Sequence, residues 1–75
     1  MDVRVKFVCV GIRSNPPSKS KIFTFWAVVY GSEENKSFSS SYPSGRLELE
    51  ITFASPASDA FELGKEYYLN IMPAD

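Results

Sequence analysis

The sequence predicts a single, mainly β domain over residues 1–75, in the form of a small, partly open five-stranded barrel or a compact sandwich. Apolar and polar residues alternate in several short segments, as they do in half-buried strands. Turns containing glycine or proline separate these segments, and none has the apolar spacing of a helix long enough to cover a sheet. Strands that are apolar on both sides must curl around a core, so the expected outline is that of the oligonucleotide-binding and SH3-like barrels.

The first predicted strand covers residues 3–12. Its apolar residues alternate with charged ones as far as Cys9, which predicts that Cys9 is a small apolar side chain of the core. Further along, both alternating sets are apolar, so we expect either cover on both faces or a β-bulge near Gly11. Residues 13–21 include two adjacent prolines, which lack N–H donors, and we expect an exposed and fairly stiff loop there.

The second predicted strand, residues 22–30, is the most hydrophobic of the strands. Both of its alternating sets are largely apolar, which favours a central strand or a strand with one face turned to a partner. A polar turn follows it. Residues 37–42 are expected to form a short edge strand with Phe38 pointing inward, and the residues 43–45 then form a tight turn.

The third predicted strand, residues 46–53, has the cleanest alternation in the chain. Its two residue sets differ in polarity at every step, which is typical of a strand with one buried face. The residues expected to face the core are Leu47, Leu49, Ile51 and Phe53, and those expected to face water are Arg46, Glu48, Glu50 and Thr52.

A short helix is expected near residues 56–62. Ser55 can cap its first turn, and the proline that follows suits the first helical position. Gly64 is expected to end this helix in the left-handed conformation that glycine adopts at no steric cost. Phe61 and Leu63 are the side chains expected to fill the core beneath it.

The closing strand is predicted over residues 65–72. Its apolar residues alternate from Tyr67 onward, and Tyr68 falls out of phase with them. Because adjacent residues of a strand point to opposite faces, both tyrosines cannot lie in the core. The tyrosine on the outside is therefore the best single indicator of a binding surface.

Charge is distributed unevenly along the chain. Residues 1–21 hold five basic residues against one acid, a net charge of +4, whereas residues 22–75 hold three basic residues against eight acids, a net charge of −5. One interpretation, which we favour, pairs these charges across a sheet surface, with Arg4 and Lys6 facing Glu48 and Glu50. The other interpretation is a basic edge that receives an anionic ligand or nucleic acid.

The residue content disfavours catalysis. The chain has no histidine, the commonest general base, and its one cysteine cannot form an intrachain disulfide or complete a zinc site without histidine partners. The serines lie in turn-rich stretches with no adjacent base, and Glu48 and Glu50 alternate with core residues and should be solvated. We therefore expect a protein that is not an enzyme and needs no metal or cofactor.

The aromatic residues exceed what a core of this size can hide, since the chain has eleven of them. Exposed aromatic side chains beside basic ones form either a stacking surface for nucleic acid or a protein-binding surface. The acidic remainder of the domain argues against nucleic acid as the main ligand and favours a protein or a small nucleotide. The candidate binding residues are Arg4, Lys6, Lys19, Lys21, Trp26, Tyr30 and Tyr68.

Three blocks of the sequence resemble a group of short, uncharacterised proteins of tailed bacteriophages. Residues 31–38 contain a Glu-Asn-Lys-x-Phe block, residues 42–49 contain a Pro-Ser-Gly turn before a strand, and residues 61–69 contain Phe-x-x-Gly-Lys-x-Tyr-Tyr. The resemblance covers roughly residues 31 to 72, and the tyrosine before the Pro-Ser-Gly turn and the Pro-Pro loop depart from it. No activity and no site residue come from this group.

The resemblance implies a phage accessory protein that acts in the host cytoplasm. This location agrees with an N-terminus that lacks the shape of a signal peptide, with the absence of an apolar run of membrane-spanning length, and with a single cysteine. The expected function is to block a host factor, as an anti-defence inhibitor that binds a protein or sequesters a nucleotide signal. The alternatives are a barrel that binds single-stranded nucleic acid and a virion accessory protein. A homodimer is a further alternative, because pairing lets a small domain enlarge its core.

Overall fold

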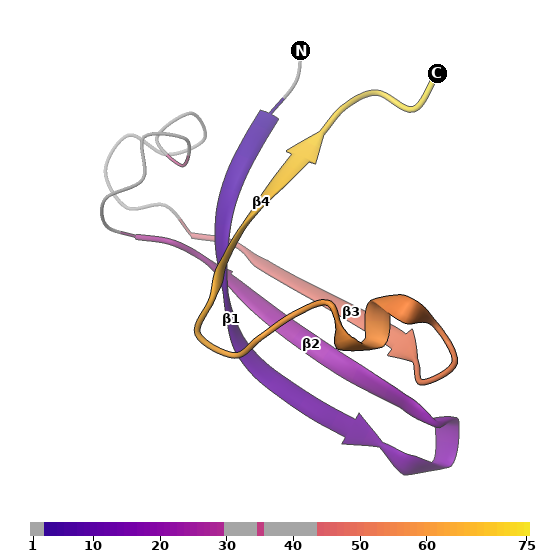
Figure 1. Ribbon diagram of the computed structural model, residues 1–75. Helices are drawn as coiled ribbons and strands as arrows, with labels where there is room; N and C mark the ends of the chain where they lie inside the picture. The colour runs from indigo at the N-terminus through magenta and orange to yellow at the C-terminus, as the bar shows by residue number, and fades with distance from the viewer. Residues whose placement is uncertain (1–2, 30–34, 36–43) are drawn as a thin grey trace.

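The computed structural model describes residues 3–29, 35 and 44–75. Four strands within these ranges form one antiparallel sheet that curls into a half-barrel, in the order β3-β2-β1-β4 (Figure 1). The prediction of a mainly β domain is confirmed. The edge strand expected at residues 37–42 lies outside the described residues. The four strands are β1 (Val3–Asn15), β2 (Ser20–Ala27), β3 (Arg46–Thr52) and β4 (Glu66–Ile71).

Strands β1 and β2 form a longer hairpin than the sequence predicted. The loop expected at residues 13–21 is present but shorter, because the ladder continues until Asn15 lies opposite Ser20. Only the 3₁₀ turn η1 (Pro16–Ser18) and Lys19, which adopts the left-handed conformation with φ of 51°, connect the strands. The loop is limited to these four residues, because the residues on either side of it keep their N–H donors and can pair.

The β-bulge expected near Gly11 is confirmed, since the β1–β2 register shifts between Cys9 and Gly11. One extra residue on β1 at this point increases the local twist, which helps the sheet to curl. Cys9 itself is 1% exposed and belongs to the core, as predicted.

The helix expected at residues 56–62 is only a 3₁₀ turn, η3 (Pro56–Asp59), and Ser55 makes no side-chain cap hydrogen bond to it. Gly64 therefore does not end a helix. It has a φ of 83° in a separate turn, where the N–H of Lys65 donates to the carbonyl of Glu62. Residues 53–65 thus form an irregular segment that crosses the sheet between β3 and β4 (Figure 1).

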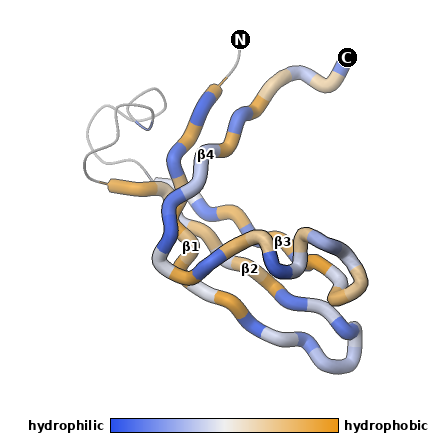
Figure 2. Tube along the Cα trace, viewed as in Figure 1, coloured by the Kyte–Doolittle hydropathy of each residue, from blue (hydrophilic) through white to orange (hydrophobic). Residues whose placement is uncertain are grey.

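The core lies between the inner face of the sheet and this crossing segment. Alternating hydropathy along the first half of β1 and along β4 marks the two faces (Figure 2). Phe61 packs on the core as predicted, but Leu63 is 65% exposed and does not. Leu49 and Phe53, which were also expected inside, are exposed because β3 is an edge strand and the crossing segment does not cover it fully. The buried apolar residues are Val5, Phe7, Cys9, Phe23, Phe25 and Ala27.

Candidate functional site

The β1–β4 register assigns the two adjacent tyrosines to opposite faces. Tyr67 lies opposite Phe7 and packs against the core, whereas Tyr68 lies opposite Lys6 on the outer face and is 49% exposed. The prediction that one of the pair must point outward is confirmed, and Tyr68 is that residue.

Two basic side chains of β1 lie over the ring of Tyr68. The guanidinium carbon of Arg4 is 3.8 Å from the ring centroid, and the Lys6 ammonium is 5.5 Å from it. Contacts of this kind are worth about 0.5–1 kcal/mol at exposed positions. The Lys6 ammonium also lies 3.7 Å from a carboxylate oxygen of Glu66. One interpretation of the sequence put Arg4 and Lys6 near an exposed aromatic residue, and the strand register determines that this residue is Tyr68.

Trp26 lies on the same outer face, on β2, which neighbours β1 on the side away from β4. It is 56% exposed and stands opposite Val8 on one side and Arg46 on the other. Val8 is two residues beyond Lys6 on β1, so its side chain shares the face of Lys6 and Tyr68. The guanidinium of Arg46 contacts the carboxylate of Glu48 at 2.9 Å. The outer-face patch is defined here as Arg4, Lys6, Trp26, Arg46 and Tyr68.

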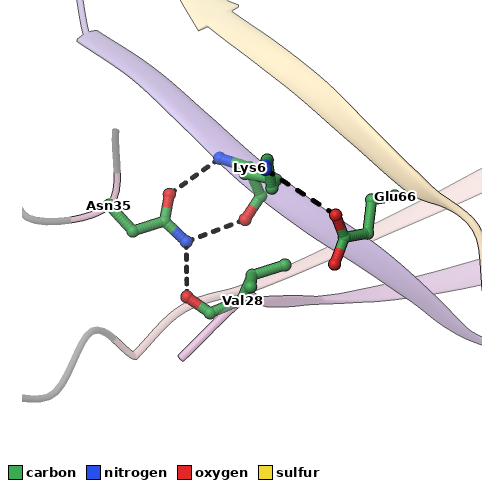
Figure 3. Close-up of polar contacts among 4 residues, drawn as sticks. All are labelled: Lys6, Val28, Asn35 and Glu66. Atoms are coloured by element: carbon green, nitrogen blue, oxygen red, sulfur yellow. Dashed lines mark hydrogen bonds and ion pairs between the residues drawn. The ribbon is translucent and has the colours of Figure 1, made fainter. Parts of the chain in front are cut away.

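The side chain of Asn35 holds β1 in place at the side of the strand, next to Lys6. Asn35 is fully buried, and its Oδ1 accepts a hydrogen bond from the Lys6 N–H at 2.7 Å. Its Nδ2 donates to the carbonyls of Lys6 and Val28 at 2.8 and 2.7 Å (Figure 3). The amide therefore makes the hydrogen bonds that a neighbouring strand would make to β1 at the point where β2 ends. Because both backbone groups of Lys6 point toward this side, Lys6 and Tyr68 form a non-hydrogen-bonded pair, in which side chains approach closely.

The remaining candidate residues do not join the patch. Lys19 follows the far end of β1, beyond the 3₁₀ turn. The ammonium of Lys21 is directed to η3, where it donates to the carbonyl of Ser58 and to the carboxylate of Asp59, each at 3.2 Å. Tyr30 lies outside the described residues. Arg46 belongs to the patch but was not among the candidates, although its place in the water-facing set of β3 was a signal for it.

The expected pairing of Arg4 and Lys6 with Glu48 and Glu50 is wrong. Strand β1 pairs with β2 and β4, while β3 pairs only with β2, so these charges lie on strands that are not neighbours. Glu50 instead accepts hydrogen bonds from the hydroxyl of Ser20 at 2.5 Å and the amide of Asn15 at 3.2 Å. These two hydrogen bonds, with Ser20 contributing more, hold the pKa of Glu50 below its usual value.

An apolar pocket of about 130 Å³ opens on the inner face, between the two edge strands. The sequence did not predict it, because it exists only where the curled sheet brings β3 and β4 near each other without joining them. A second hollow of about 190 Å³, lined by Lys6, Glu66, Tyr67 and Tyr68, shares both of these tyrosines with it. The apolar pocket is lined by Phe7, Phe25, Leu47, Leu49, Phe61, Tyr67, Tyr68 and Leu69.

The described residues contain no group of three or more cysteine or acidic side chains that could hold a metal ion. In the same part of the chain, no helix is long and apolar enough to cross a membrane. No protein-family model, no curated protein and no solved structure matches the chain. The fold and the patch together describe a small antiparallel half-barrel that presents aromatic and basic side chains on its outer face.

Proposed function

We propose that this chain is a non-enzymatic phage protein that binds a host protein through the outer-face patch and blocks it, as an inhibitor of host defence in the host cytoplasm. The observation that supports binding is the exposure of Trp26 and Tyr68 on one face, flanked by Arg4 and Arg46. Tryptophan, tyrosine and arginine are the residues that most often dominate protein–protein binding energy. The phage origin and the inhibitory role rest on the resemblance of the three sequence blocks.

The charges of the patch favour a protein partner over nucleic acid. Lys6 and Arg46 each lie within salt-bridge distance of a carboxylate, from Glu66 and Glu48 respectively. Among the described residues, Arg4 is the patch cation without such a neighbour. A mixed surface of this kind resembles the polar rim of a protein interface, whereas a site for single strands needs an excess of positive charge along its length.

A second candidate function is the binding of a nucleotide or a short single strand. The stacking of Arg4 on Tyr68 at 3.8 Å favours it, because a base can occupy a similar position against an aromatic ring or a guanidinium plane. In this proposal the domain keeps the open, five-stranded outline expected from the sequence, the form in which oligonucleotide-binding barrels hold their ligands. A steep salt dependence of binding would distinguish it from the first function.

The experiment is a capture of host proteins with the purified chain as bait, compared among Trp26→Ala, Arg4→Ala and Leu63→Ala variants. Leu63 is the matched control because it is an apolar side chain at least as exposed as Trp26 but lies on the crossing segment. We expect a specific host protein to be retained by the wild type and by Leu63→Ala. Trp26→Ala should weaken its affinity about 30-fold, as removal of a hot-spot residue does.

Titration with the purified host protein then gives the dissociation constants directly. Equal binding by Trp26→Ala and the wild type would contradict the assignment of the patch. Binding of oligonucleotides in place of a protein, weakening steeply as salt rises, would replace the first function with the second.

A further inference from the structure

We propose that two copies of this chain associate through the edge of β4 that faces away from β1, pairing antiparallel about a two-fold axis beside Tyr68. The result is one sheet that runs through both molecules. This inference goes beyond the proposed function, which uses the outer face of one copy.

The backbone groups at this edge follow from the pairing of β1. The N–H and carbonyl of Lys6 point away from β4, toward Asn35 and Val28. The N–H and carbonyl of Cys9 point the other way, toward the chain just before β4, because they exchange hydrogen bonds with the backbone of residues 64–65. Because these directions alternate along a strand, the backbone groups of Tyr67 and Leu69 point toward β1 and those of their neighbours point outward. The residues whose backbone groups face outward are Glu66, Tyr68 and Asn70. No strand among the described residues pairs with them.

The opposite edge of the sheet is less suited to the same pairing. By the same alternation, β3 directs the backbone groups of Arg46, Glu48 and Glu50 outward. A symmetric pair centred on Glu48 would place two carboxylates directly opposite each other, and a shift by two residues toward Thr52 would oppose Glu48 and Glu50. Only the shift the other way opposes Glu48 with Arg46, and these two side chains already contact each other within one copy. Charged residues commonly protect edge strands from self-association in this way. Strand β4 has one acidic residue among its outward-directed set.

The outer face is complementary to itself at the β4 edge. When Tyr68 pairs with its counterpart, Glu66 lies opposite Asn70 of the second copy. Within each copy Asn70 lies opposite Arg4. The carboxylate of Glu66 therefore approaches Arg4 of the second copy across two strand spacings, about 10 Å, which the two long side chains can span together. Symmetry forms this contact twice.

The inner face gains apolar contacts in the same register. Tyr67 lies opposite Leu69 of the second copy, at the mouth of the pocket of about 130 Å³ between the edge strands. The neighbouring Ile71, on the same face, is 51% exposed in a single copy. Pairing covers part of this apolar surface, which a monomer would leave in water.

Sedimentation equilibrium over a range of protein concentrations tests the dimer, with a proline variant at each edge. Asn70→Pro removes an outward N–H and leaves the β1–β4 ladder intact, so the fold is kept while pairing is blocked. Glu48→Pro makes the same change at the β3 edge and is the matched control. We expect a dimer for the wild type and Glu48→Pro. The dissociation constant of Asn70→Pro should be raised about 100-fold. Circular dichroism verifies that each variant folds.

A charge exchange tests the register. Arg4→Glu and Glu66→Lys each oppose like charges across the dimer and should weaken it about tenfold. An equimolar mixture of the two variants restores both attractive contacts, so it should associate as tightly as the wild type.

A monomeric wild type at every concentration, or a dimeric Asn70→Pro, overturns the proposal. So does a mixture that is no tighter than either charge variant alone. A monomeric wild type whose binding to another protein is abolished by Asn70→Pro would mean that a foreign strand occupies this edge.

Discussion

At the residue scale, Asn35 makes the most specific contribution to the fold. Its fully buried amide satisfies three backbone groups, two on Lys6 and one on Val28, where the β1–β2 ladder ends. An amide supplies a donor and an acceptor side by side, in the same arrangement as a strand backbone. Few other side chains could take this position, because both functions are needed at once.

Replacing Asn35 should therefore cost more than an average substitution. We expect Asn35→Ala to lower the free energy of unfolding by about 2–4 kcal/mol, since it leaves buried backbone groups without partners. Asn35→Asp should be at least as harmful, because a carboxylate would face the carbonyls of Lys6 and Val28. Urea denaturation gives the values. Asn70→Ala, at an exposed site, should change stability by less than about 0.5 kcal/mol. If Asn35→Ala also changed the free energy of unfolding by so little, the Asn35 amide would not be needed for stability.

At the element scale, Glu50 links three strands. Its Oε2 on β3 accepts hydrogen bonds from Ser20 on β2 and from Asn15 at the end of β1. The link replaces the cross-strand ion pairs expected from the sequence. It stabilises the far end of the hairpin, where the two strands continue past the predicted loop.

This link should make stability depend on acid pH. The pKa of Glu50 is lower in the folded chain than its usual value of 4.5, first because of the Ser20 hydroxyl and then the Asn15 amide. The stabilisation is therefore complete above pH 4.5 and is lost as the pH falls through the lowered pKa. Thermal unfolding should be measured from pH 6 downward for both proteins. Below pH 4.5, the midpoint temperature of Glu50→Gln should fall less than that of the wild type. Parallel profiles for the two proteins would contradict the link.

At the scale of the whole molecule, the core depends on one segment that crosses the sheet. Phe61 brings its ring to 5.3 Å from Phe23 and 5.1 Å from Phe25, in edge-to-face geometry. It also lies 5.1 Å from Tyr67, whose hydroxyl accepts a hydrogen bond from the Glu62 N–H. These contacts connect β2, β4 and the crossing segment into one unit.

Truncating Phe61 should weaken the packing of β2, β4 and the crossing segment together. Phe61→Ala should lower the free energy of unfolding by about 3 kcal/mol, near the lower end for buried phenylalanines because this side chain is only partly buried. Chemical denaturation and the binding of an apolar dye to the native protein measure the effect. Leu63→Ala, on the same segment but exposed, should leave both nearly unchanged. Equal effects of the two substitutions would show that Phe61 is not a core residue.

Much of the fold could be predicted from local pattern. The strand positions, the bulge near Gly11 and the burial of Cys9 all follow from alternation along single strands. The hairpin end was mispredicted because polar residues there resemble a loop, although they pair. The helix was mispredicted because proline and serine favour the start of a helix and cannot extend one without further packing.

By itself, the sequence determined which residues share a face, because the period of two along a strand is a local property of the backbone. The opposite orientations of Tyr67 and Tyr68 came from that period alone. Only the tertiary structure decided which faces and charges meet. Strand order depends on pairings between distant segments, and it placed Arg4 on Tyr68 instead of beside Glu48. The patch and the position of β4 at the end of the described sheet exist for this reason, since both combine strands whose proximity no local pattern encodes.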